Sequence, residues 1–132
     1  MQRLKELFKT WWPTAIVVAV ILYATLNSNP IAVDKLPLIP HIDKWIHAIM
    51  FGGLFSALAF DRYRSGKALT HRSLIKFAAI AVCAGLLDEF AQGALENGRS
   101  AEVLDFAADC GGILVAYITA PPAIKRVVKI RG

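Results

Sequence analysis

The feature that most constrains this chain is how its cations are sorted among four apolar runs. The runs cover about residues 11–28, 42–60, 75–95 and 101–120. Three of the 15 Lys and Arg residues precede the first run, five lie between the second run and the first turn of the third, and four follow the last run. Helices that cross a membrane alternately would place all three groups on one side, which is the cytoplasmic side of membrane proteins. A water-soluble bundle has no reason to sort its cations in this way.

Composition agrees with a membrane location. Of the 132 residues, 56% are hydrophobic and 19% are charged, whereas soluble domains average about 25% charged residues. Each run is shorter than the ~20 apolar residues of a full span once its charges are discounted, so hydropathy alone leaves a soluble helical core possible. The cation sorting favours an all-α integral membrane bundle. We predict four transmembrane helices in a single domain, 1–132, with both termini cytoplasmic.

Local signals refine the ends of the runs. Pro13 suits the first turn of a helix, where its missing N–H costs little. The residues after Leu26 lack a small-x-small cleavage pattern, which favours a retained first helix over a signal peptide. The last run is expected to stop at Pro121 and Pro122, since proline disrupts helix interiors.

Other classes of function find little support. The net charge of +5 is divided among short clusters without an aromatic and basic face, which argues against nucleic-acid binding. Cys83 and Cys110 lie in apolar runs without metal-ligand spacing, and we expect them to be buried. We expect close helix packing at the glycines of the runs, which are Gly52, Gly53, Gly85, Gly111 and Gly112.

Ionisable and amide side chains occur within or beside three of the runs, always at the extracytoplasmic end. Such groups are costly in hydrocarbon and mark functional or mutually satisfied sites. We therefore predict one outward-facing polar site formed by these residues: Asp43, Lys44, His47, Asp88, Glu89, Gln92, Arg99, Asp105 and Asp109.

The residue types suggest two classes of role. Candidate acid–base groups are His47, Asp88, Glu89 and Asp105. Candidate substrate-binding groups are Asp43, Lys44, Gln92, Arg99 and Asp109, with Lys44 and Arg99 suited to an anionic headgroup. The predicted partner is a membrane lipid or a lipid-linked envelope molecule. The alternative is a non-catalytic assembly protein in which the same side chains form an internal salt-bridge network.

We expect neither a metal nor another cofactor. His47 is the only histidine within the runs and no cysteine pair accompanies it, which disfavours a structural zinc site. An ion pathway is also disfavoured, because the cytoplasmic halves of the helices are expected to lack buried ionisable groups.

The polar residues together resemble a known pattern. Asp43-Lys44-x-x-His47-x-x-x-Phe51, then Asp88-Glu89-x-x-Gln92, Arg99 and Asp105-x-x-x-Asp109-x-x-Gly112 are similar to the VanZ-like family, over more than half of the chain. Asp109 stands where the family commonly has Asn. The resemblance implies a small multi-pass protein of the bacterial cell membrane. It also implies a cell-envelope context, that of low-level resistance to the glycopeptide teicoplanin.

Overall fold

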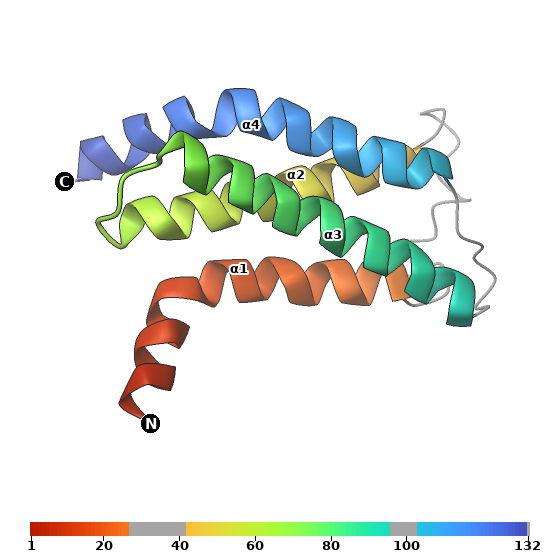
Figure 1. The fold of residues 1–132 in the computed structure, drawn as a ribbon, viewed down its shortest axis with the longest axis horizontal. Coiled ribbons are helices and arrows are strands. Elements are labelled where there is room, and N and C mark those ends of the chain that lie inside the picture. The colour runs from red at the N-terminus through yellow and green to blue at the C-terminus, as the bar shows by residue number, and fades with distance from the viewer. Residues whose placement is uncertain (27–41, 96–102, 132) are drawn as a thin grey trace.

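The computed structural model describes residues 1–26, 42–95 and 103–131, and within them the side chains of 1–24, 44–91 and 106–128. This part of the chain forms four helices and no strand. They are α1 (Gln2–Leu26), α2 (Ile42–Arg64), α3 (His71–Leu95) and α4 (Val103–Arg131). The prediction of an all-α fold with four helices is confirmed for the described residues (Figure 1).

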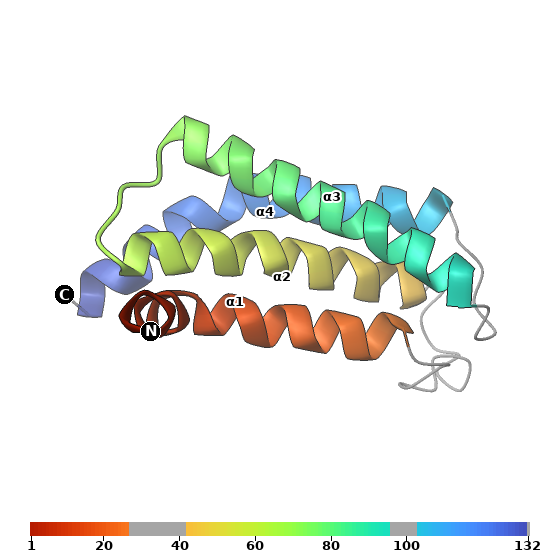
Figure 2. The same ribbon diagram turned by 60° about the horizontal axis from the view of Figure 1, so that its bottom comes forward.

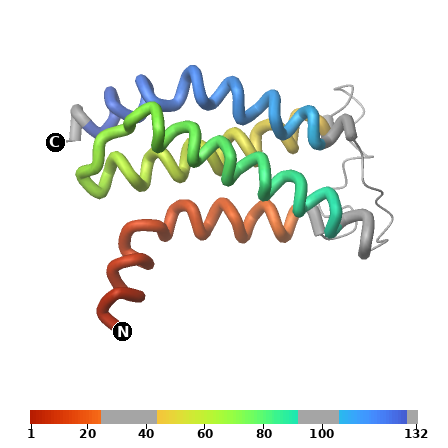
Figure 3. The backbone as a smooth tube through the Cα atoms, viewed as in Figure 1, coloured from red at the N-terminus to blue at the C-terminus, as the bar shows by residue number. Residues whose placement is uncertain are grey.

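The helices form an elongated bundle with α2 at its centre, because α2 packs against each of the other three (Figure 2). Its most extensive contact is with α4. The core contains large side chains of α2, such as Phe51, Phe55 and Leu58, together with Phe77 of α3 and Ile113 of α4. The start of α1, the end of α2 and the end of α4 lie at one end of the bundle (Figure 3).

Two segments are long and apolar enough to cross a membrane, Gln2–Ala24 and Phe106–Val128. Only 11% and 22% of their residues are buried within the bundle. A soluble core helix would be mostly buried, so this apolar surface needs another cover. Cys83 follows the same pattern: it is exposed on α3, against the expectation that it is buried, and Cys110 is half-buried.

The expected stop at the proline pair is wrong, because α4 continues through Pro121 and Pro122 to Arg131. Local propensity disfavours this continuation. Ala120, Pro121 and Ile124 are buried against the other helices. Packing before and after the proline pair therefore stabilises the continuous helix.

The centre of the bundle depends on a close approach of α2 and α4. A Cβ atom added to Gly112 would overlap the backbone carbonyl of Ala48, and one added to Gly52 would lie 2.8 Å from the carbonyl oxygen of Gly112. Only glycine therefore allows the two backbones to meet here. The packing prediction is correct for these two glycines but wrong for Gly53 and Gly111, where an added Cβ meets nothing within 4 Å.

A second constraint lies where α1 changes direction. Trp11 has non-helical angles, φ −110° and ψ 15°, and Pro13 follows two residues later. The residues before Trp11 turn away and run across the long axis of the bundle (Figure 1). This bend separates the carbonyls of Lys9 and Thr10 from their usual partners four residues on, Pro13 having no N–H to offer.

Two side chains of α2 replace the missing hydrogen bonds. Arg64 donates to the carbonyls of Lys9, at 3.2 Å, and Thr10, at 2.8 Å. Asp61 accepts from the backbone N–H of Thr14 at 3.1 Å and from its hydroxyl at 2.6 Å. Asp61 is fully buried, so the expectation of no buried ionisable group at this end is wrong. A carboxylate at a helix start is favoured by the exposed N–H groups there.

The glycine contact yields a direct prediction. Gly112→Ala should lower the free energy of unfolding by about 1–3 kcal/mol, the usual cost of overpacking, because the added methyl meets backbone that cannot yield cheaply. Unfolding in mixed micelles, followed by circular dichroism, measures the change. The matched control is Gly111→Ala, where the space is open. Equal losses in both variants would contradict the close contact.

Candidate functional site

One buried cluster joins three of the helices. His47 of α2 lies with its Nδ1 atom 2.9 Å from an Asp109 carboxylate oxygen on α4 and 3.9 Å from a Glu89 carboxylate oxygen on α3. All three side chains are buried. The structure thus brings together three of the residues that the sequence analysis placed in one site, although His47 and Asp109 are 62 residues apart in the sequence.

Glycines position this cluster. Ala48, which meets Gly112 at the α2–α4 contact, is the residue after His47, and Gly112 lies one turn after Asp109. On the other side, a Cβ at Gly85 of α3 would lie 3.0 Å from the second carboxylate oxygen of Asp109. The close contact of α2 with α4 therefore places the His47 imidazole beside the Asp109 carboxylate. The missing side chain at Gly85 leaves room for that carboxylate.

The chemistry of the pair follows from its surroundings. With Asp109 ionised, its carboxylate only accepts hydrogen bonds, and the imidazole then donates from Nδ1. The imidazole also stacks on the fully buried ring of Phe51, with centroids 6.4 Å apart. In an apolar environment such a hydrogen bond is strengthened, and removing one partner is costly. The arrangement fixes the orientation of His47, as in acid–base sites where a carboxylate orients an imidazole.

The same three residues satisfy the spacing of a cation site. Each offers one ligand atom, and these atoms lie within 4.8 Å of one another. One imidazole and two carboxylates are ligands that Zn²⁺ or Mn²⁺ accepts, with an open position for a further ligand. The expectation of no metal rested on the single histidine and the lack of a cysteine pair, and the spacing of these three ligand atoms leaves that expectation a prediction.

Asp88 is buried but lines a different space. It borders a cavity of about 300 Å³ between α1, α2 and α3, with Ile21, Phe51 and Leu87 among its neighbours. The neighbouring Glu89 is the acid that reaches the cluster. Burial of both acids excludes simple solvation of this helix end.

The other predicted residues divide into two groups. Lys44 is half-buried near the start of α2. The side chains of Asp43, Gln92 and Asp105, and the whole of Arg99, lie outside the described residues.

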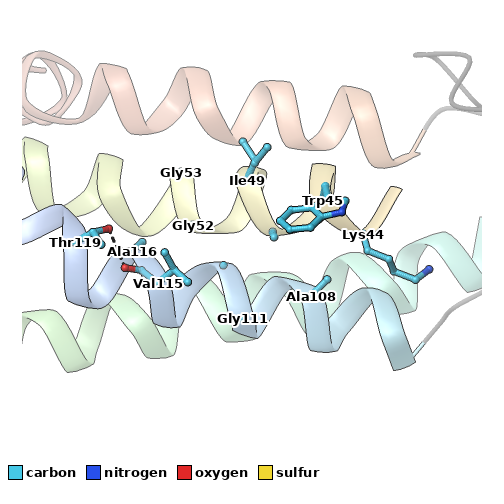
Figure 4. A pocket seen from close by; sticks show the side chains of 12 residues that line it. Lys44, Trp45, Ile49, Gly52, Gly53, Ala108, Gly111, Val115, Ala116 and Thr119 are labelled. Carbon is cyan, nitrogen blue, oxygen red and sulfur yellow. Dashed lines mark hydrogen bonds between the residues drawn. The ribbon is translucent and has the colours of Figure 1, made fainter. Parts of the chain in front are cut away.

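A groove between α2 and α4 was not predicted from the sequence. It has a volume of about 600 Å³ and runs along small residues, including Ala48, Gly53 and Gly111. Trp45 and Ile49 border it, and Lys44 stands at the end nearest the start of α2 (Figure 4). The paired glycines on both helices were the available signal, since the member of each pair that does not touch a backbone leaves open space.

Comparison with protein-family models, with curated proteins and with solved structures gives no match to this chain.

The buried pair can be tested by truncation. Asp109→Ala should lower the free energy of unfolding by about 3 kcal/mol or more, because it leaves a buried polar partner behind. Unfolding in mixed micelles measures the loss, and Cys110→Ala, at the half-buried neighbouring position, is the control. A loss no larger than that of the control would contradict the pairing of His47 with Asp109.

Proposed function

We propose that this chain is a four-span protein of the bacterial cell membrane that binds an anionic lipid or lipid-linked envelope molecule at its extracytoplasmic end. Many large apolar side chains support the membrane location. More than half of the surface of each is exposed, and a soluble monomer rarely carries so large an apolar surface. They occur on α2, α3 and α4 and include Trp45, Ile49, Leu87, Phe90, Leu114 and Ile118.

The orientation is inferred from charge. Among the described side chains, every Lys and Arg except Lys44 belongs to the start of α1, the end of α2, the 65–70 connection, the start of α3 or the end of α4. Figure 1 places these segments at one end of the bundle. The positive-inside rule assigns that end, with both termini, to the cytoplasm. The end that carries Lys44 and the buried cluster then faces outward.

The observation that carries the binding proposal is a cation at the head of an apolar groove. The groove wall consists almost entirely of apolar atoms of α2 and α4, and Lys44 marks its outer end. An acyl or polyprenyl chain suits such a wall, and a phosphate at the membrane interface suits the ammonium group. The volume of about 600 Å³ falls in the range of small-molecule sites.

The buried cluster adjoins this groove. Ala48 and Ala108, which line the groove, are the sequence neighbours of His47 and Asp109. A modifying version of the function would use His47 as a general base held by Asp109, with Glu89 beside it. Catalysis by His47, Asp88, Glu89 and Asp105 remains a prediction, secondary to binding.

A non-catalytic assembly role is the second candidate, and the burial of the His47–Asp109 pair favours it. Replacing a buried pair by apolar residues of similar size is often neutral for stability. If His47→Phe with Asp109→Leu preserves folding but abolishes the cellular phenotype, the pair serves function. The resemblance to the VanZ-like family suggests teicoplanin susceptibility as that phenotype.

The topology predicts where reporters are active. Alkaline phosphatase joined after Gly132 or inserted in the 65–70 connection should be inactive, since the enzyme requires the oxidising exterior. A fluorescent protein at the same positions should be bright. Active phosphatase at either position would contradict the proposed orientation.

The groove predicts lipid selectivity. Native mass spectrometry of the detergent-purified protein should show more retained phosphatidylglycerol than phosphatidylcholine. Lys44→Gln should reduce that preference about fivefold, the effect expected for one interfacial cation. Gly111→Leu should reduce binding of both lipids, because its side chain fills the groove without touching a backbone.

Leu114→Ala is the matched control, being exposed on α4 outside the groove. Unchanged lipid binding in Lys44→Gln and Gly111→Leu would refute the binding proposal.

A further inference from the structure

The opposite end of the bundle carries a second, more polar pocket. It has a volume of about 600 Å³ and lies between the first turns of α1 and the end of α2. Three cations and one carboxylate line it: Arg3, Arg62, Lys67 and Glu6. Arg62 is held in place because its Nε donates to the carbonyl of Ala68 at 2.8 Å. The pocket is therefore suited to an anion.

The helical segment beside this pocket, residues 2–10, is amphipathic. Leu4, Leu7 and Phe8 recur at helical spacing on one face, while Lys5 and Lys9 lie on another. Leu4 and Phe8 are each 71% exposed. Within the described part of the chain, no other helix covers them. A short helix with Lys on one face and Leu or Phe on the other is typical of segments that lie in a membrane interface.

The direction of this segment fits such a position. It runs across the long axis of the bundle in Figure 1 and is seen nearly end-on in Figure 2. If the bundle spans the membrane, the segment lies along the membrane plane. The bend is fixed by Asp61 and Arg64, which hold the backbone of residues 9, 10 and 14, and Trp11 packs edge-on against Phe77 with ring centroids 6.4 Å apart. The orientation is thus built into the fold.

We propose that this pocket binds the phosphate of an anionic phospholipid from the adjacent leaflet, with Leu4 and Phe8 among its acyl chains. A phospholipid and free phosphate would present the same anionic group to Arg3, Arg62 and Lys67. The exposed apolar face selects the lipid, because inorganic phosphate would leave Leu4 and Phe8 uncovered. The inference shares the membrane embedding of the proposed function, but its site is at the other end of the bundle, so either can fail alone.

Photo-crosslinking of the full chain in phospholipid nanodiscs tests the proposal. A phosphatidylglycerol probe with a photoreactive headgroup should label peptides covering residues 2–10 and 62–67, and a phosphatidylcholine probe should label them less. Arg3→Gln and Lys67→Gln should each reduce phosphatidylglycerol labelling about fivefold. Arg72→Gln is the matched control, since Arg72 is an exposed cation near the same end but outside the pocket.

Glu6→Gln provides a test in the opposite direction. It removes the one carboxylate among the charged lining residues and should raise phosphatidylglycerol labelling about fivefold, so the test does not depend on variants that lose a cation. If Arg72→Gln loses as much phosphatidylglycerol labelling as Arg3→Gln and Lys67→Gln, the lipid is attracted by diffuse surface charge, and the pocket assignment is overturned. Competition by inorganic phosphate as strong as that by unlabelled phosphatidylglycerol would overturn the lipid assignment. Labelling confined to residues 44–53 and 108–119 would leave the outer groove intact and refute this inner site.

Discussion

The contact between α2 and α4 at Gly112 is the constraint on which the rest of the bundle depends. Without a side chain at this position, the backbone carbonyl of Ala48 approaches the opposing helix. The same approach brings His47 within hydrogen-bonding distance of Asp109. It also creates the groove, because Gly53 and Gly111 leave space beside the line of contact. The close approach of the two helices therefore produces both the buried His47–Asp109 pair and the apolar groove next to it.

The two ends of the bundle solve different electrostatic problems. At the end where α2 begins, the side chains of His47, Glu89 and Asp109 are buried and lie within 4 Å of one another through the imidazole. At the other end, Asp61 and Arg64 are joined to a bent backbone, with their own side chains 3.7 Å apart. An acid and a base three residues apart on α2 thus supply the acceptor and the donor that the bend in α1 requires. Buried polar groups therefore join three helices at one end and hold a bent backbone at the other.

The four helices and the proximity of His47, Glu89 and Asp109 were predictable from the sequence, because they follow from the apolar runs and from the cost of placing charge within them. The role of Asp61 was not predictable. Its neighbour Arg62 suggests a solvated connection, whereas the hydrogen-bond partner of Asp61 is Thr14, 47 residues away in the sequence. The helix through Pro121 and Pro122 was missed for the same reason: tertiary packing of Ala120 and Ile124 overrides a local signal. Which glycines touch a backbone and which line a groove also depends on the crossing geometry, which spacing alone does not specify.

A double-mutant cycle at His47 and Asp109 tests the central claim most directly. The free energies of unfolding of His47→Ala, Asp109→Ala and the double variant, measured in mixed micelles, give the coupling between the two side chains. A buried pair 2.9 Å apart predicts that the double loss falls short of the sum of the single losses by about 1–3 kcal/mol. Additive losses would show that the two side chains do not interact, and the convergence of α2 and α4 on one polar site would then be wrong.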